Sequence, residues 1–335
     1  MKEIKLAIIG VGEAAQNFHL PIYYKLPNVI LEGVYDRMPT KAKAIADKFE
    51  INKVYNNIDD LLANAEITAV DICTTTDTHI DFAIKAIERG KSVLIEKPIA
   101  KNYEEAKRIY DAAKKNNTKV MVATNQRFRY DAMVLKNFVQ TKELGEIFYV
   151  KGAWHQQKRG KEWRQQIERS GGGVLIDLGV SLIDSLLWIC DFPKVSSVNA
   201  SIFKQTTENV EDVCIANIKF ESGMIANLEM SWSLFGSKNV FSFDIYGSNG
   251  SAKINPLQLN KKDDDVISPI SSIDSLSNIA IHKKSFESQL KHFINGALGH
   301  QPIISTAEEA VETMKIIDML YKSAHENRPI MYDEY

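Results

Sequence analysis

The first 123 residues alternate between short apolar runs and longer segments with helical periodicity. Strands that alternate with helices of this length are typical of βαβ units, so this part of the chain predicts a parallel sheet. Helix signals agree, since Asn102 with Glu105 resembles a capping box and Gly90 can end the third helix. The expected strands lie at residues 6–9, 30–35, 69–73, 93–95 and 120–123, and the expected helices at 13–25, 39–49, 79–89 and 103–115.

The pattern changes after residue 125. Apolar residues occupy every second position from Met224 to Trp232, which indicates a strand with one buried face. Residues 255–281 are polar, and we expect them to form a surface excursion. Similar strand-like runs lie at 147–155, 195–203, 213–220 and 240–246, and helices expected at 174–189, 286–298 and 307–326 would cover one face of the sheet.

These patterns predict an α/β protein with two domains. Residues 1–124 are expected to form an N-terminal Rossmann domain with a doubly wound parallel sheet. Residues 125–335 are expected to form an α+β domain for substrate binding and oligomerisation, with a large, mostly antiparallel open sheet. The length of 335 residues and the 44% hydrophobic content suffice for two cores.

Composition argues against several other classes of protein. The net charge is −2 and long basic tracts are missing from the sequence, which argues against a nucleic-acid partner. Cys73, Cys190 and Cys214 are scattered, which argues against a disulfide framework and a clustered metal site. The N-terminus lacks a signal-peptide pattern, and no run approaches the roughly 18 apolar residues of a membrane helix. We therefore expect a cytoplasmic protein.

Residues 10–15 form a Gly-rich turn between a predicted strand and a predicted helix. In this G-x-G-x-x-A pattern Gly10 permits a tight turn, Gly12 lets the backbone approach a pyrophosphate, and the small Ala15 packs helix on strand. Asp36 ends the second strand, where a carboxylate can bond both ribose hydroxyls. The alternative is a tight turn without a ligand, followed by a helix cap at Asp36. The predicted dinucleotide ligands here are Gly10, Gly12, Glu13, Ala14, Ala15, Asp36 and Arg37.

The predicted cofactor is NAD or NADP. Asp36 favours NAD because a carboxylate repels a 2′-phosphate, whereas Arg37 could pair with that phosphate. A hydroxyl-rich patch at residues 73–79 follows the third strand and could line the nicotinamide side of the cleft. Alternatively, Asp77 or Thr78 caps the next helix. The predicted ligands of this patch are Thr74, Thr75, Thr76 and His79.

Several motifs in this order resemble the glucose–fructose oxidoreductase/inositol dehydrogenase (Gfo/Idh/MocA) family over essentially the whole chain. They are the turn at 10–15, Glu96-Lys97-Pro98, the run 125–128, the Gly-rich run 171–179 and the tail from 285 to 329. The resemblance implies a two-domain NAD(P)-dependent oxidoreductase for sugars, polyols and related hydroxy or carbonyl compounds, assembled as a homodimer or homotetramer. Glu96, Lys97 and Asn125 join the predicted cofactor contacts.

Lys97 lies at the carboxyl end of a predicted strand, where open α/β sheets bind ligands. The resemblance implies that Lys97 contacts the reacting hydroxyl or carbonyl and that Glu96 and Pro98 fix its position. It also implies a catalytic Asp, with a His four residues later, on the helix after the triple Gly. Asp177 matches the Asp, but Ser181 occupies the His position, and serine does not titrate near neutral pH.

The helix predicted at 174–189 is apolar nearly all round, except for Asp177, Ser181 and Asp184. Their spacing of four and three places them on one helical face. A carboxylate there needs a hydrogen bond, an ion pair or a functional role. The alternative is a purely structural polar stripe, with Asp184 as a brace. Our hypothesis is that Lys97 is the principal acid/base, that Asp177 assists, and that Ser181 marks an unusual substrate or reduced activity.

Further polar residues fit substrate binding. His155 ends the first strand of the second sheet and is another candidate base, although a His beside a Trp is also common as a packed surface residue. Trp163 and Arg164 lie in segment 158–170, which we expect to be either a mobile loop that closes over a polyhydroxylated or anionic ligand or a solvated surface segment. The predicted substrate ligands are Lys97, Arg127, His155, Trp163, Arg164, Asp177 and Ser181.

Three functions therefore fit the sequence. The first is an NAD(P)-dependent oxidoreductase for a sugar or polyol. The second is an NAD(P)-binding sensor or scaffold with reduced or lost turnover, and the third is redox-assisted glycoside cleavage. The half-exposed face of the second sheet could pair with another copy of the chain.

Overall fold

A computed structural model describes residues 3–156, 162–233, 239–263, 266–272 and 278–335. The chain divides into two compact units, one made of residues 1–125 and 283–311 and the other of residues 126–282 and 312–335. Residues 283–311, which the sequence pattern groups with the second domain, thus cluster with the first unit.

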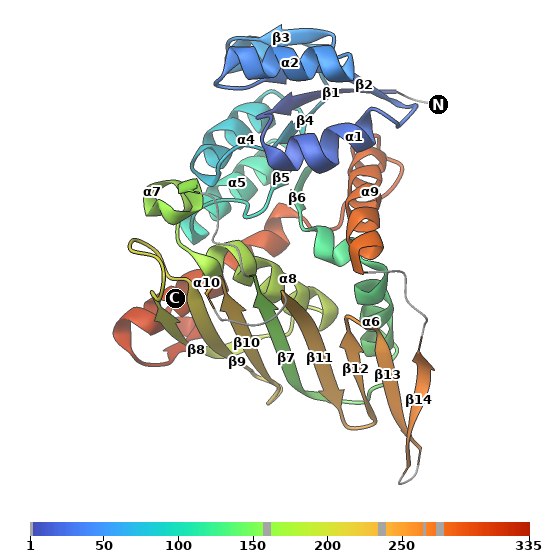
Figure 1. Ribbon diagram of the computed structural model, residues 1–335, viewed down its shortest axis with the longest axis vertical. Helices are drawn as coiled ribbons and strands as arrows, with labels where there is room; N and C mark the ends of the chain where they lie inside the picture. The colour runs from blue at the N-terminus through green and yellow to red at the C-terminus, as the bar shows by residue number, and fades with distance from the viewer. Residues whose placement is uncertain (1–2, 157–161, 234–238, 264–265, 273–277) are drawn as a thin grey trace. The chain divides into compact units, whose positions relative to one another are not determined.

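The first unit is built on a six-stranded parallel sheet with strand order β3-β2-β1-β4-β5-β6 (Figure 1). The order reverses between β1 and β4, so the loops after these strands flank the switch point at which open α/β sheets bind ligands. This confirms the predicted doubly wound sheet. The sequence pattern misses β3 because three residues are too few to show periodicity. The strands are β1 (Ile4–Ile9), β2 (Val29–Tyr35), β3 (Lys53–Tyr55), β4 (Ala69–Ile72), β5 (Ser92–Glu96) and β6 (Val120–Ala123).

The helices of the first unit begin and end at residues with clear local signals. Asn102 Oδ1 accepts a hydrogen bond from the Glu105 backbone N–H at 2.9 Å, which confirms the predicted N-cap. Gly90 follows α4 with a φ of +69°, a conformation that glycine adopts without strain. The helices are η1 (Ala15–His19), α1 (Leu20–Tyr23), α2 (Pro39–Phe49), α3 (Ile58–Ala63), η2 (Thr76–Thr78), α4 (His79–Glu88) and α5 (Tyr103–Lys115).

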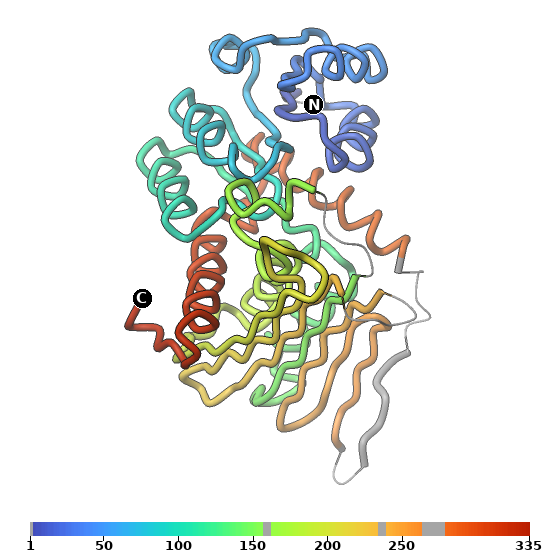
Figure 2. Tube along the Cα trace, turned by 60° about the vertical axis from the view of Figure 1, so that its left-hand side comes forward, coloured from blue at the N-terminus to red at the C-terminus, as the bar shows by residue number. Residues whose placement is uncertain are grey.

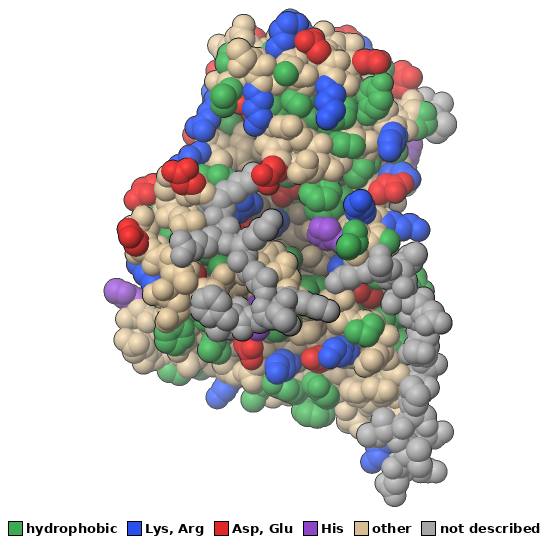
Figure 3. All heavy atoms as spheres, in the orientation of Figure 1, with side chains coloured by type: hydrophobic (Ala, Val, Ile, Leu, Met, Phe, Trp, Pro, Cys, Tyr) green, Lys and Arg blue, Asp and Glu red, His purple; other side chains and the backbone are tan. Residues whose placement is uncertain are grey.

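Segment 283–311 completes the first unit beside β6. The Val122 N–H donates to the Ser305 carbonyl at 2.8 Å, and Lys119 Nζ donates to the Gly296 carbonyl at 2.7 Å. On the visible face of this unit, basic and acidic side chains are interspersed (Figure 3).

The second unit contains a nine-stranded sheet with strand order β14-β13-β12-β11-β7-β10-β9-β8-β15. Within this sheet, β10–β7 is the only parallel pair among the described strands, which confirms the predicted, mostly antiparallel sheet. The chain ends beside β8, where β15 pairs with it (Figure 2). The strands are β7 (Ile147–His155), β8 (Val195–Phe203), β9 (Val213–Phe220), β10 (Ile225–Ser231), β11 (Val240–Gly247), β12 (Gly250–Ile254), β13 (Gln258–Asp263), β14 (Val266–Ser272) and β15 (Ile330–Met331).

The predicted surface excursion at 255–281 is wrong for most of its length. Residues 258–263 and 266–272 form β13 and β14, which extend the sheet at one edge, and α9 begins at residue 278. The reason is that edge strands in many proteins carry charged and polar residues, which hides their periodicity. Residues 264–265 and 273–277 lie outside the described part of the chain.

The central helix of the second unit, α8, is buried along its whole length. A Cβ at Gly152 on β7 would lie 2.8 Å from Leu228 Cδ2 and 3.3 Å from Phe243 Cδ2, so glycine leaves room for these side chains of the adjacent strands β10 and β11. Among the described residues, the helical stretch 167–189 alone is long and apolar enough to cross a membrane, contrary to the sequence-based expectation, but 94% of its most apolar window is buried. This burial fits a core helix. The remaining helices are η3 (Asn125–Phe128), α6 (Tyr130–Gln140), η4 (Glu162–Gln165), α7 (Ile167–Ser170), η5 (Leu175–Gly179), α8 (Val180–Ile189), α9 (Asn278–Ala297), α10 (Ala307–Glu326) and η6 (Tyr332–Glu334).

Candidate functional site

Predicted ligands from five loops gather at the carboxyl edge of the first sheet. Because all six strands are parallel, the loops that follow them share this edge. The residues that follow β1, β2, β4, β5 and β6 there are Gly10, Asp36, Thr74, Lys97 and Asn125, respectively.

The Gly-rich turn and the Thr-rich loop touch across the switch point. A Cβ atom at Gly10 would lie 2.6 Å from Thr74 Cγ2 and 3.0 Å from the Cys73 carbonyl carbon, and the φ of Gly10 is +88°. Glycine satisfies both constraints. Ala15 is fully buried at the start of η1, a single π-helical turn. These small residues fit a dinucleotide whose pyrophosphate approaches the backbone and the helix N-terminus.

Asp36 braces the Gly-rich turn from the end of β2. Its Oδ2 accepts a hydrogen bond from the Val11 N–H at 2.8 Å, and its Oδ1 accepts one from the Met38 N–H at 2.9 Å. Met38 lies directly before α2, so the second hydrogen bond gives Asp36 part of the helix-capping role that the alternative interpretation predicted. Each carboxylate oxygen still has a lone pair for a ribose hydroxyl. Arg37 and Glu13 are exposed.

The Thr-rich loop is organised by its own hydrogen bonds. Thr78 Oγ1 donates to Thr74 Oγ1 at 2.7 Å, and Thr76 is buried. His79 is also buried, with Nδ1 at 2.9 Å from the Pro98 carbonyl and Nε2 at 3.3 Å from the Thr74 carbonyl. Burial lowers the pKa of His79. These contacts favour a brace between two loops over the predicted contact of His79 with cofactor.

Lys97 is half-buried directly after β5. Its backbone N–H donates to Glu96 Oε2 at 3.1 Å. The other carboxylate oxygen of Glu96, Oε1, lies 3.0 Å from His19 Nε2. This contact is an ion pair when the His19 ring is protonated.

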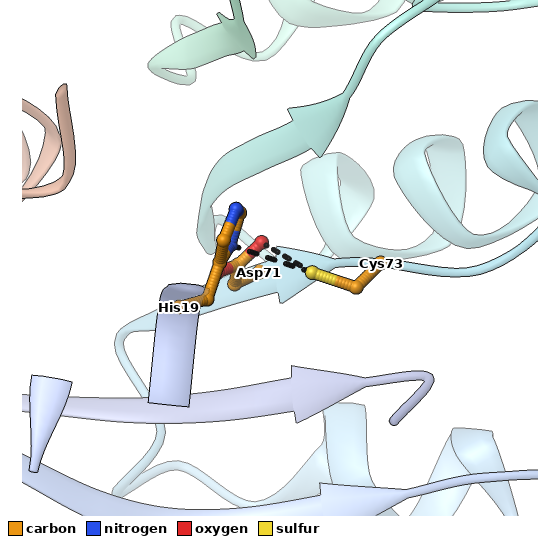
Figure 4. A group of neighbouring side chains, drawn as sticks. All are labelled: His19, Asp71 and Cys73. Carbon is orange, nitrogen blue, oxygen red and sulfur yellow. Dashed lines mark hydrogen bonds and ion pairs between the residues drawn. The ribbon is translucent and has the colours of Figure 1, made fainter. Parts of the chain in front are cut away.

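His19 belongs to a buried polar cluster that sequence reasoning misses (Figure 4). Its Nδ1 lies 2.7 Å from Asp71 Oδ2, and Cys73 Sγ lies 3.4 Å from the same nitrogen and 3.3 Å from Asp71 Oδ1. His19 and Asp71 are both 0% exposed. Asp71 in the middle of an apolar strand is the signal that could have revealed the cluster, since a buried carboxylate requires a partner.

The electrostatics of the cluster keep the His19 ring protonated. Burial by itself lowers the pKa of His19, but the charge and hydrogen bond of Asp71 raise it well above the ordinary value. Burial raises the pKa of Glu96, and the neighbouring His19 and Lys97 outweigh it, so the net shift is downward. Burial and Asp71 raise the pKa of the Cys73 thiol. One cation therefore stands between two carboxylates.

Asp177 lies in the second unit, within the π-helical turn η5. Its Oδ1 accepts a hydrogen bond from Arg164 Nε at 3.1 Å, and the Arg164 guanidinium lies over the Trp163 ring at 4.5 Å from its centroid. Within the segment 158–170, predicted as a mobile loop or a solvated surface segment, residues 162–165 and 167–170 form the short helices η4 and α7; residues 157–161 lie outside the described part of the chain, and closure over a ligand stays a prediction. The structure thus joins three predicted substrate ligands in one cluster.

The turn before Asp177 is held by Glu211. Its carboxylate accepts hydrogen bonds from the N–H groups of Gly173 and Leu175, each at 3.0 Å, and from the Tyr321 hydroxyl at 2.8 Å. A Cβ at Gly173 would lie 2.0 Å from the Glu211 carbonyl oxygen, and one at Gly172 would lie 2.0 Å from the Tyr321 hydroxyl. Close packing therefore explains Gly172 and Gly173, whereas the φ of +84° at Gly171 explains the first glycine.

Comparison with known proteins identifies the family. A family model described as "Oxidoreductase family, NAD-binding Rossmann fold" (GFO_IDH_MocA) matches residues 4–124, and one described as "Oxidoreductase family, C-terminal alpha/beta domain" matches residues 136–332. The chain belongs to the Gfo/Idh/MocA oxidoreductase family. This confirms the resemblance and assigns an NAD-binding function to the first sheet.

Several members of the Gfo/Idh/MocA family are similar to the chain over most of its length. D-glucoside 3-dehydrogenase of Escherichia coli (strain K12) is 26% identical over 339 aligned positions, covering 96% of this chain and 95% of the relative. Levoglucosan dehydrogenase of Pseudarthrobacter phenanthrenivorans is 27% identical, covering 76% and 74%. A solved structure of levoglucosan dehydrogenase in complex with NADH and levoglucosan has a TM-score of 0.88 at 21% identity, covering 99% of this chain and all of that one. That likeness shows a shared fold.

In the Gfo/Idh/MocA helix η5–α8, the three polar residues predicted to share one face differ in burial. Asp177 is half-buried, whereas Ser181 and Asp184 are buried. Asp184 accepts hydrogen bonds from Arg127 Nε at 2.9 Å and Nη2 at 2.7 Å. Arg127 is 1% exposed. This geometry favours a structural brace over the predicted contact of Arg127 with substrate.

Two further predicted ligands, His155 and Asn125, have contacts of their own. His155 ends β7 with Nε2 at 3.7 Å from Glu229 Oε2, and burial lowers its pKa more than Glu229 raises it. Asn125, after β6, donates from Nδ2 to Ser285 Oγ at 3.0 Å. The roles of His155 in substrate binding and of Asn125 in cofactor binding stay predictions.

Proposed function

We propose that this Gfo/Idh/MocA protein is a dehydrogenase that oxidises a secondary hydroxyl of a sugar or sugar derivative, or reduces the corresponding carbonyl. Relatives named for a D-glucoside and for levoglucosan support this substrate class. The observation that carries the proposal is the position of Lys97 on the same sheet edge as the Gly10 turn. NAD, when bound at that turn, supplies the hydride acceptor.

Lys97 is the principal acid/base of the proposed reaction. Oxidation of a carbinol requires a group that takes the hydroxyl proton while the carbon loses a hydride. The ε-amine of Lys97 takes that proton, and in the reverse direction the ammonium group returns it. Glu96 holds the backbone of Lys97 through the hydrogen bond to its N–H.

Asp177 and Ser181 assist at the substrate. The carboxylate of Asp177 can accept a hydrogen bond from a sugar hydroxyl while Arg164 orients it. Arg164 and Trp163 offer a donor and an aromatic face, both of which suit a polyhydroxylated ring. Ser181 can pass a proton through water, but it cannot be the final base, because its hydroxyl does not titrate near neutral pH.

Turnover assays test the proposal directly. We expect NADH absorbance to appear when the purified protein is mixed with NAD and a panel of glucosides, anhydrosugars and polyols. Lys97→Met should then lower kcat by roughly 100-fold or more, while Lys85→Met, at an exposed lysine of the same unit, should leave it unchanged. A Lys97→Met variant that turns over at the wild-type rate would show that Lys97 is structural.

Asp177→Asn, alone and with Lys97→Met, tests whether both residues serve one chemical step. Residues that act as a unit have non-additive effects, so the double variant should lose little more activity than Lys97→Met alone. If the losses of the two single variants multiply in the double variant, Lys97 and Asp177 act in independent steps.

Two other outcomes would favour the other functions. NAD binding in calorimetry, without turnover of any compound in the panel, would favour the sensor or scaffold. Tightly held NAD together with glycoside cleavage and no net redox change would favour redox-assisted glycoside cleavage.

We also propose that the protein is cytoplasmic and forms a homodimer or homotetramer. Ile215, Ile225 and Tyr246 on the second sheet are 51%, 36% and 38% exposed, and exposed apolar side chains of this kind can pair with a second copy of the chain. Light scattering should give a mass of two or four chains. A monomer at micromolar concentration would contradict the assembly.

A further inference from the structure

We infer that His19 is a positioning residue, which fixes the catalytic Lys97 through Glu96. His19 ends the π-helical turn η1, which follows the Gly-rich turn. Its ring lies between Asp71 of β4 and Glu96 of β5, with nitrogen–oxygen distances of 2.7 and 3.0 Å. The imidazole thereby links the helix of the cofactor turn to the strand that carries Lys97.

The charge balance of the cluster requires a protonated ring. Both ring nitrogens face carboxylate oxygens, and both can donate at the same time only in the imidazolium form. A neutral ring would leave one carboxylate without a cation inside the sheet, and such burial is costly. Tyr23, edge-on to the ring with 6.3 Å between centroids, and the thiol of Cys73 add no compensating positive charge.

Glu96 transmits this constraint to Lys97 with its two oxygens. Oε1 is paired with His19, and Oε2 accepts the Lys97 N–H. A carboxylate held at both oxygens fixes the backbone from which the Lys97 side chain leaves. Displacement of a catalytic group by about 1 Å can cost about 100-fold in rate, so loss of the His19 contact should reduce turnover.

The group His19, Asp71 and Cys73 could also offer three ligands to a metal ion. However, the distances of 2.7, 3.3 and 3.4 Å between their polar atoms fit direct hydrogen bonds. Ligands at about 2.0–2.3 Å from a tetrahedral zinc would lie further apart than the closest of these pairs. Burial and Asp71 also keep the Cys73 sulfur protonated by raising its pKa, which disfavours thiolate ligation.

Two substitutions at His19 separate positioning from a purely structural role. The amide nitrogen of Asn occupies about the place of Nδ1, so His19→Asn keeps a donor beside Asp71 and loses the one beside Glu96. The longer Gln places its nitrogen near Nε2, so His19→Gln keeps the donor beside Glu96 and loses the one beside Asp71. Both variants are neutral and differ by one methylene.

We expect His19→Asn to lower kcat by roughly 10- to 100-fold and His19→Gln to lower it less, with the KM for NAD changed less than roughly threefold in both. His19→Asn activity equal to or above that of His19→Gln would overturn the inference and leave His19 as a structural partner of Asp71.

This inference rests on the proposed role of Lys97, and the two can fail separately. If Lys97→Met retains full turnover, the proposed function fails whatever the His19 variants do. If Lys97→Met is inactive while His19→Asn and His19→Gln are equally active, the inference about His19 alone fails.

A spectrum of the wild-type protein supplies a readout that needs neither turnover nor stable variants. In the 15N NMR spectrum of histidine-labelled protein, both ring nitrogens of His19 should remain protonated at pH 8, well above the ordinary histidine pKa of about 6.5. A neutral His19 ring at pH 8 would overturn the proposed charge link between Asp71 and Glu96.

Discussion

A side chain at Gly173 would occupy the space of Glu211, because its Cβ atom would lie 2.0 Å from the Glu211 carbonyl oxygen. The Glu211 carboxylate also accepts the Gly173 N–H at 3.0 Å. Glu211 thus holds the start of the helical stretch that carries Asp177 by both its backbone and its side chain.

Gly173→Ala should destabilise the protein by about 3 kcal/mol, because the added methyl group meets backbone rather than a flexible side chain. The free energy of unfolding in urea measures this cost. Gly223→Ala is the control: a Cβ at Gly223 meets no atom within 4 Å and its φ is +88°, so only the backbone conformation is penalised, by about 1 kcal/mol. Equal costs at the two positions would contradict the packing argument.

Arg127 and Asp184 form a buried ion pair, and removal of either partner leaves a charge without compensation. Arg127→Ala or Asp184→Ala should therefore cost about 3–5 kcal/mol of unfolding free energy. Replacing both residues with apolar side chains, as in Arg127→Met with Asp184→Leu, should cost much less than the sum of the single changes. If Arg127→Ala instead raised the substrate KM without loss of stability, Arg127 would be a substrate ligand after all.

Asp36→Ala should raise the KM for NAD roughly tenfold or more, because hydrogen bonds from ribose hydroxyls to a charged carboxylate are lost. Initial-rate measurements with NAD and NADP check this, and discrimination against NADP should fall in the same variant. Asp47→Ala, at an exposed residue of α2, serves as the control. Unchanged NAD kinetics in Asp36→Ala would assign Asp36 only to the hydrogen bonds with Val11 and Met38.

Stability should depend on pH through His19. Burial opposes protonation, yet Asp71 raises the pKa of His19 well above its ordinary value in the folded protein. Its contribution is therefore complete below the unfolded pKa of about 6.5, declines as the pH rises above that value, and is lost once the pH passes the folded pKa. The difference in Tm between wild type and His19→Gln should accordingly shrink from pH 6 to pH 9. A constant difference would mean that the ring does not titrate on unfolding.

Local patterns in the sequence were sufficient to predict most of the architecture. The strand, turn and helix around Gly10 carry their own signals, because periodicity and glycine placement act over a few neighbouring residues. The capping of α5 by Asn102 was predictable for the same reason. Exceptions are β13 and β14, whose polar edge positions obscure the two-residue alternation.

Partners separated along the chain were decided by the tertiary structure. The sequence identifies Lys97 and the family motif around it, but it does not show that His19 meets Asp71 and Glu96, since that meeting depends on the order β1-β4-β5 in the sheet. Likewise, Arg127 resembles a substrate ligand until folding buries it against Asp184. Short-range hydrophobic and steric preferences along the sequence determined the helices and strands. A buried charge, in contrast, must be compensated by whichever residue the fold brings near it, so the tertiary structure determined the partners of Asp71, Glu96 and Asp184.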